Sequence, residues 1–149
     1  MAPIIASVEI SRRPEDVFAY ITNPSHLPEW QESVVRVKSD DSAPTGGGSR
    51  AVITRRVGPR EIDMTTEITD LDPPRSWRVR GVDGPVRGNV NGTIEPLDDG
   101  ARSRVKLDLD FEGHGIGKLL IPLLVKRQAQ KELPMNVQKL KERLESAAV

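Results

Sequence analysis

The stretch IGKLLIPLLVKRQAQKELPMNVQKLKERLE, residues 116–145, decides the fold because it holds the only long helical pattern in the chain. At about 1.5 Å per residue, a helix of roughly thirty residues spans about 45 Å. A domain of this size is narrower than that, so one face of the helix needs a large partner surface. Short alternating runs precede it, and these predict strands. We therefore expect a curved antiparallel sheet around one long helix, with a cavity between them.

The long helix is expected to differ between its two halves. The downstream half carries a regular apolar stripe, formed by Leu133, Val137, Leu140 and Leu144. An upstream cluster points in a different direction and comprises Ile116, Leu119, Leu120, Leu123 and Leu124. Pro122 and Pro134 each lack a backbone donor, so we expect a break or kink at one or both. The upstream half should then line the cavity, while the downstream half closes the core.

Seven strands are predicted upstream of this helix, most of them with one polar and one apolar face. That pattern is typical of an antiparallel sheet with one wet side. The expected strands are 4–11, 33–38, 50–57, 60–71, 77–83, 86–97 and 101–111. Between the first two, Pro14 begins a short helix that Asn23-Pro24 ends, and residues 25–31 allow one or two further helical turns. The fold class is α+β, and the 149 residues fit one domain, 1–149.

Composition excludes several classes of protein and of site. The 22 basic and 22 acidic residues cancel, so no overall field draws in nucleic acid. The absence of cysteine excludes disulfides, thiolate metal sites and a cysteine nucleophile. No apolar run reaches the roughly 18 residues of a membrane span, and the start does not resemble a signal peptide. We expect a cytoplasmic protein without stable membrane insertion; the oligomeric state stays open.

Motifs for metal, phosphate or nucleophilic chemistry are missing from the sequence. His26 and His114, the only histidines, have neither the spacing nor the carboxylate neighbours of a zinc site. The stretch Gly113–Lys118 fails as a phosphate loop, because Glu112 and Leu119 stand where glycine and a hydroxyl belong. There is no G-x-S-x-G elbow. We therefore expect no metal and no cofactor, and we keep His26 as a candidate acid-base group near the cavity mouth.

Two arginines and three aromatic residues are the remaining candidates for a pocket wall. Arg55 shares a strand face with apolar neighbours, and Arg127 lies where the helix stripe fails. Either could bind a ligand carboxylate or carbonyl. A buried arginine without a partner is costly, however, so a surface position is favoured for both. Tyr20, Trp30 and Trp77 combine apolar area with one polar atom, which suits a pocket as well as ordinary core packing.

Several stretches together resemble a known family. They are VEISRRPEDVFAYITNPSHLPEW (8–30), TGGGSR (45–50), EITDLDPPRSW (67–77) and the closing apolar helix. In this order they resemble the polyketide cyclase/dehydrase and lipid-transport group of the START-like, Bet v 1-like superfamily. The resemblance implies a helix-grip fold: seven antiparallel strands in the order 1-7-6-5-4-3-2, two short helices after strand one, and a long C-terminal helix across the concave face. It also implies a cavity for a hydrophobic small molecule, but not an activity, because this fold hosts many.

Three functions stay open at this point. The first is a carrier for a polyketide, lipid or isoprenoid-like ligand, with a pocket formed by Tyr20, Leu27, Trp30, Ile53, Met64, Val90, Leu109, Leu119 and Leu123. The second is a polyketide cyclase or dehydratase using the same cavity, with His26, Arg55 or Arg127 as the polarising or acid-base group. The third is a protein-interaction module whose cavity has collapsed.

Overall fold

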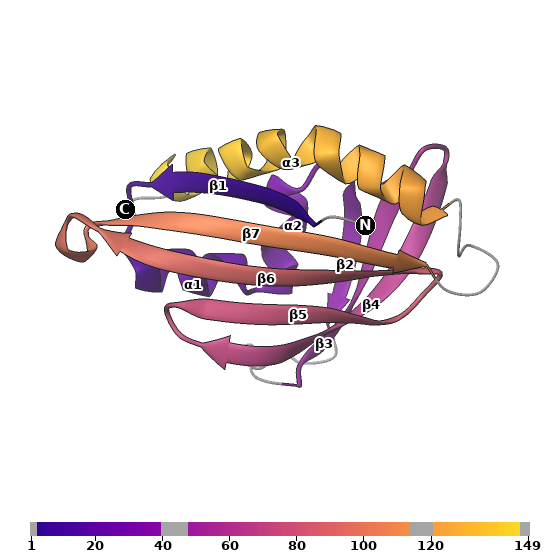
Figure 1. Ribbon diagram of the computed structural model, residues 1–149, viewed down its shortest axis with the longest axis horizontal. Helices are drawn as coiled ribbons and strands as arrows, with labels where there is room; N and C mark the ends of the chain where they lie inside the picture. Colours follow the sequence, from indigo (N-terminus) through magenta and orange to yellow (C-terminus); the bar gives the residue numbers. More distant parts are fainter. Residues whose placement is uncertain (1–2, 40–47, 114–120, 147–149) are drawn as a thin grey trace.

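A seven-stranded antiparallel sheet in the order β1-β7-β6-β5-β4-β3-β2 curves around the C-terminal helix α3 in the computed structural model (Figure 1). The structure describes residues 3–39, 48–113 and 121–146. The strands are β1 (Ile4–Ile10), β2 (Val34–Ser39), β3 (Arg50–Val57), β4 (Arg60–Asp72), β5 (Ser76–Asp83), β6 (Val86–Leu97) and β7 (Arg102–Gly113). The helices are α1 (Pro14–Ile21), α2 (Leu27–Trp30) and α3 (Ile121–Ser146), with short 3-10 turns at Pro24–His26 and Asp98–Gly100. This arrangement confirms the predicted helix-grip fold, including the strand order and the short helices after β1.

The alternation of residue types along the strands produces one buried and one exposed face of the sheet. In β1 the polar residues Ser7 and Glu9 are exposed, while Ile10 between the sheet and α3 is fully buried. Register shifts interrupt the pairing of β2 with β3 and of β4 with β5. Such bulges bend and twist a sheet locally, so they favour the curvature that leaves room under α3.

Helix α3 is continuous from Ile121 to Ser146, so it has no break at Pro134, one of the two positions where a break or kink was predicted. Pro134 leaves the carbonyl of Gln130 without its helical donor. Both residues are exposed, so that carbonyl lies on the solvent side, where water can satisfy it. Pro122 lies in the first turn, where a missing N–H breaks no helical bond. The part of the predicted helix before residue 121 and most of the stretch Gly113–Lys118 lie outside the described residues. No helix in the described part of the chain is long and apolar enough to cross a membrane.

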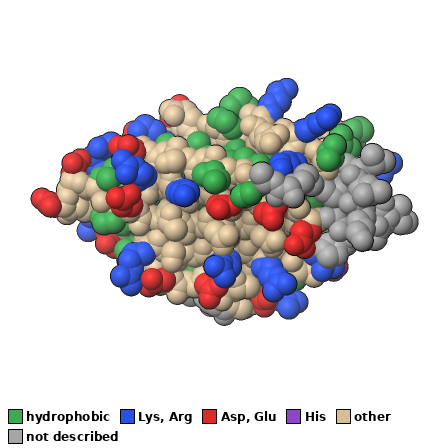
Figure 2. Space-filling model, viewed as in Figure 1, with side chains coloured by type: hydrophobic (Ala, Val, Ile, Leu, Met, Phe, Trp, Pro, Cys, Tyr) green, Lys and Arg blue, Asp and Glu red, His purple; other side chains and the backbone are tan. Residues whose placement is uncertain are grey.

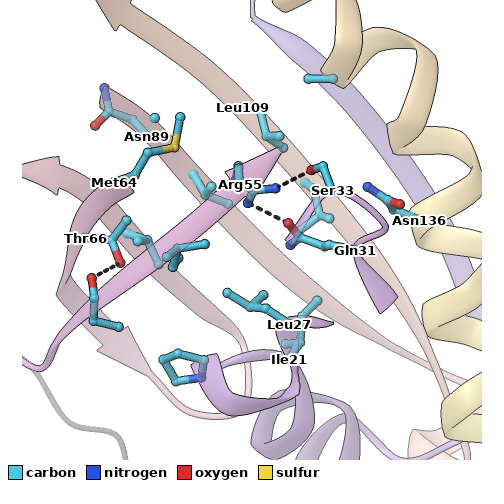
Figure 3. A pocket seen from close by; sticks show the side chains of 18 of the residues that line it. Ile21, Leu27, Gln31, Ser33, Arg55, Met64, Thr66, Asn89, Leu109 and Asn136 are labelled. Atoms are coloured by element: carbon cyan, nitrogen blue, oxygen red, sulfur yellow. Dashed lines mark hydrogen bonds between the residues drawn. The ribbon is translucent and has the colours of Figure 1, made fainter. Parts of the chain in front are cut away.

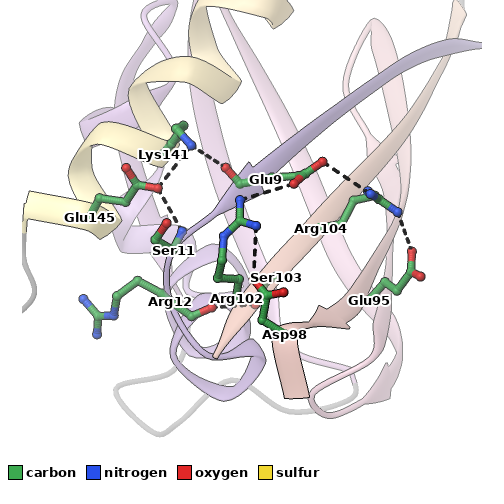
Figure 4. Close-up of polar contacts among 10 residues, drawn as sticks. All are labelled: Glu9, Ser11, Arg12, Glu95, Asp98, Arg102, Ser103, Arg104, Lys141 and Glu145. Carbon is green, nitrogen blue, oxygen red and sulfur yellow. Dashed lines mark hydrogen bonds and ion pairs between the residues drawn. The ribbon is translucent and has the colours of Figure 1, made fainter. Parts of the chain in front are cut away.

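The C-terminal end of α3 is fastened to the first strand and the turn after it. Lys141 Nζ donates to the backbone carbonyl of Glu9 at 2.7 Å, and the backbone N–H of Ser11 donates to the Glu145 carboxylate at 2.8 Å (Figure 4). Arg12 donates to the carbonyl of Leu144 at 2.8 Å. Below these contacts lies the main core, which contains the predicted stripe of Leu133, Val137, Leu140 and Leu144. The stripe therefore closes the core as expected.

The outer face of β1, β7 and β6 is covered by ion pairs. Glu9 lies between Arg102 at 3.2 Å and Arg104 at 3.3 Å (Figure 4). Arg104 also reaches Glu95 at 3.2 Å, and Arg102 reaches Asp98 at 3.3 Å. Acidic and basic side chains are accordingly interspersed over this face (Figure 2). Exposed pairs of this kind each contribute little stability, but their mixture leaves no field of one sign on this face.

Gly92 allows Trp77 to lie flat against β6. Trp77 and Gly92 are directly opposite each other in the pairing of β5 with β6. A Cβ atom added at Gly92 would lie 2.2 Å from the indole ring of Trp77. The ring in turn meets Phe18 edge-on, with centroids 5.9 Å apart. The missing side chain of Gly92 therefore leaves the space that the Trp77 ring occupies.

Replacing Gly92 with alanine is expected to destabilise the protein by about 2 kcal/mol, because the new methyl group forces Trp77 out of its position. Chemical denaturation monitored by circular dichroism measures this change in the free energy of unfolding. Gly88→Ala is the matched control, since its Cβ would lie 3.1 Å from the Phe111 ring and demands a smaller adjustment. In a Trp77→Phe background the penalty of Gly92→Ala should shrink. If Gly92→Ala lowers the free energy of unfolding equally in both backgrounds, the ring of Trp77 is not what occupies the space at Gly92.

Candidate functional site

A cavity of about 170 Å³ lies between the concave face of the sheet, the α1–α2 region and the inner face of α3. Its walls are mainly apolar. The larger apolar side chains that line it are Ile21, Leu27, Trp30, Ile53, Val57, Met64, Ile68, Trp77, Val79, Val90, Leu107, Leu109, Phe111, Val125 and Leu133. Mainly apolar walls with a few polar groups are typical of a site for an apolar molecule, and the volume limits that molecule to a small one.

The inner face of α3 supplies one wall of this cavity. The lining residues of α3 are Val125, Gln128, Ala129, Glu132, Leu133 and Asn136. They recur at intervals of three and four residues, so they lie on one side of the helix. Gln128 Nε2 donates to the backbone carbonyl of Arg56 at 2.7 Å, and Asn136 Oδ1 accepts from the backbone N–H of Glu32 at 3.3 Å. These bonds hold the helix against β3 and the connection between α2 and β2.

Arg55 turns into the cavity from β3 (Figure 3). One of its terminal nitrogens donates to Gln31 Oε1 at 2.6 Å, and the other donates to Ser33 Oγ at 3.1 Å. Burial lowers the pKa of Arg55 to about 10, and the nearby negative charge of Glu132 opposes that change. Arg55 therefore still carries its charge at neutral pH. The surface position favoured from the sequence is wrong for this residue, because the connection before β2 supplies two polar partners that no strand pattern reveals.

Six of the nine predicted pocket residues line the cavity: Leu27, Trp30, Ile53, Met64, Val90 and Leu109. Trp30 is also part of the main core, and its buried indole nitrogen has no hydrogen-bond partner in the described structure. Leu119 lies outside the described residues. Leu123 is 45% exposed and is not among the lining residues, because α3 turns Val125 inward instead.

Tyr20 and His26 pair with each other rather than facing the cavity. Their rings stack with centroids 4.4 Å apart, and His26 Nδ1 lies 3.1 Å from the Tyr20 carbonyl. The Tyr20 hydroxyl donates to Glu29 at 2.7 Å. Burial and this bond to Glu29 raise the pKa of Tyr20. Neither residue lines the cavity, so its described walls do not include His26, the candidate acid-base group.

Arg127 is exposed on the outer side of α3, two positions from the inward-facing Val125. The surface position favoured from the sequence is therefore confirmed for Arg127. Sequence reasoning missed the polar lining residues, among them Gln31, Ser33, Gln128, Glu132 and Asn136. One signal in the sequence could have identified the helix face on which three of them lie. Extending the apolar stripe upstream from Leu133 in steps of four residues reaches Ala129 and then Val125.

Comparisons with known proteins agree with this geometry. A family model described as "Polyketide cyclase / dehydrase and lipid transport" matches residues 1–145. No curated protein sequence matches the chain. Among solved structures, the protein TTHA0849 from Thermus thermophilus superposes with a TM-score of 0.79 at 20% identity, over 99% of each chain.

Two further solved structures share the fold at lower identity. A START superfamily protein from Mycobacterium smegmatis gives a TM-score of 0.79 at 16% identity, over 98% of this chain and 99% of the other. The Zhui aromatase/cyclase from Streptomyces sp. R1128 gives 0.80 at 15% identity, over 99% of this chain and 95% of the other. At such identities the likeness establishes the fold alone.

Proposed function

Because the chain belongs to the polyketide cyclase / dehydrase and lipid transport family, we propose that it binds and carries a small, mainly apolar molecule in the cavity under α3. The observation that supports this proposal is the cavity itself, about 170 Å³ with mostly apolar walls. Burying apolar surface contributes roughly 25 cal/mol per Å², so the walls can supply the affinity. The few polar groups, with Arg55 at their centre, would fix the orientation of the ligand.

A neutral apolar probe tests this proposal directly. N-phenyl-1-naphthylamine carries no charge at neutral pH and becomes fluorescent when it leaves water. We expect saturable binding with one site per chain, and we expect native mass spectrometry of gently purified protein to show a small molecule released on collisional activation. A chain that neither binds the probe nor retains a small molecule would contradict the proposal.

A cyclase or dehydratase is the second candidate, and Arg55 is the observation that favours it. A buried guanidinium beside a bound ketone can stabilise the negative charge that develops on oxygen during enolisation. Replacing Arg55 with glutamine should then abolish turnover of a poly-β-ketone substrate while a neutral product analogue still binds. Turnover that survives the replacement would exclude this role. The open cavity argues against the third alternative, an interaction module with a collapsed interior.

A further inference from the structure

The charged side chains that line the cavity differ in whether an oppositely charged side chain pairs with them. The charged residues that line the described cavity are Arg50, Arg55 and Glu132. Arg50 is exposed and pairs with Glu67 at 3.5 Å. Within the described residues, no ion pair within 4.0 Å joins Arg55 to a carboxylate, and its hydrogen-bond acceptors, Gln31 and Ser33, are neutral. Arg55 is therefore a cation whose direct hydrogen-bond partners are neutral, while the charge of Glu132 acts on it only from a distance.

Arg55 also keeps hydrogen-bonding capacity for a guest. A guanidinium has five N–H donors in a fixed fork. The structure shows two of them in use, one to Gln31 and one to Ser33. No hydrogen bond from Arg55 Nε is seen among the described residues. This atom is also not one of the fully buried nitrogens that lack a partner there. Because Arg55 lines the cavity, its remaining donors are available to a ligand bound there.

A carboxylate matches these requirements better than a neutral oxygen does. A carbonyl or hydroxyl accepts a hydrogen bond but leaves the buried charge in place. A carboxylate accepts two bonds from one guanidinium and also neutralises it. We infer that the ligand of this cavity is an apolar monocarboxylic acid, whose carboxylate binds Arg55 while its hydrocarbon body lies against the walls formed by β3–β7 and α3. This inference deepens the proposed function and rests on it.

Glu132 modulates this site. It lines the same cavity from α3, and its charge acts on Arg55 without direct contact. A bound carboxylate would experience repulsion from Glu132 as well as attraction to Arg55. The two side chains should therefore have opposite effects on the affinity for an acid and little effect on the affinity for its ester.

Calorimetric titration with decanoic acid and with methyl decanoate tests the inference, because the two differ in charge and scarcely in apolar area. We expect the wild-type protein to bind the acid at least tenfold more tightly than the ester. Arg55→Gln should weaken binding of the acid about 10- to 100-fold and leave binding of the ester within about threefold. Glu132→Gln should strengthen binding of the acid several-fold.

Arg56→Gln is the matched control. It removes the same charge from the next position of β3, where Arg56 is exposed and faces Glu61 at 3.7 Å, so binding of both compounds should stay unchanged. If wild-type protein binds acid and ester equally, or if Arg55→Gln weakens both alike, the carboxylate assignment is wrong while the carrier function stands. If neither compound nor N-phenyl-1-naphthylamine binds, the carrier function itself fails. The wild-type and Glu132→Gln comparisons decide the matter even if Arg55→Gln does not fold.

Discussion

Replacing Ala129 with tryptophan is expected to weaken binding of a neutral apolar ligand by about 100-fold or more. Ala129 lines the cavity from the inner face of α3, so an indole at this position occupies the space of the ligand. Losing about 120 Å² of apolar contact between ligand and wall corresponds to roughly 3 kcal/mol, or about two orders of magnitude in affinity. Fluorescence titration with N-phenyl-1-naphthylamine measures the change.

Gln130→Trp is the control for this prediction. Gln130 is the next residue of α3 and is exposed, so it adds the same aromatic group on the solvent side. It should leave the affinity of the probe within about twofold. Circular dichroism and the unfolding midpoint show whether Ala129→Trp remains folded, and Ala129→Leu should give an intermediate loss. A folded Ala129→Trp protein with undiminished affinity would place the ligand elsewhere.

Replacing Leu140 with alanine is expected to lower the free energy of unfolding by about 3 to 4 kcal/mol. Leu140 has no exposed surface and lies in the main core between α3 and the sheet. The replacement removes buried methyl groups and leaves a void that the surrounding strands can only partly fill. Since a domain of this size is stable by only about 5 to 15 kcal/mol, the loss is a large fraction of the total. Urea denaturation measures it.

Leu124→Ala provides the comparison on the same helix. Leu124 is 56% exposed, so the same change of residue should alter the free energy of unfolding by less than about 0.5 kcal/mol. Similar losses at positions 124 and 140 would mean that the helix does not present the inner face described here.

The sheet could be predicted from the sequence because period-two alternation is a local property. β3 and β6 begin and end at the residues expected, Arg50–Val57 and Val86–Leu97. Alternation also placed Val90 and Leu109 on the concave face, where they line the cavity. A strand on the edge of a cavity looks like any other half-buried strand, so the pattern could identify its face but not the empty space in front of it.

The inner face of α3 was harder to predict, because its cavity-lining part is not apolar. Gln128 and Glu132 interrupt the stripe, and the cluster that includes Leu123 and Leu124 diverted the prediction to the wrong side. Hydrophobicity locates a helix face only where that face meets a solid core. Where the face lines a cavity, some of its positions carry polar residues, so the apolar stripe is interrupted there. Arg55 was a candidate, but its inward position could not be favoured from the sequence, since its polar partners lie more than twenty positions away in the chain.

The unequal attachment of α3 along its length has a consequence for how the helix opens locally. Near its C-terminus the helix has bonds to the backbone of Glu9 and Ser11 and a fully buried Leu140, whereas its first described turns expose Leu123 and Leu124 and bury Val125. Segments with fewer buried contacts open locally at a smaller free energy than the molecule as a whole. The first described turns of α3 would then open while its C-terminal turns stay in place. We therefore expect the amide protons of the first described turns of α3 to exchange with solvent sooner than those near its C-terminus.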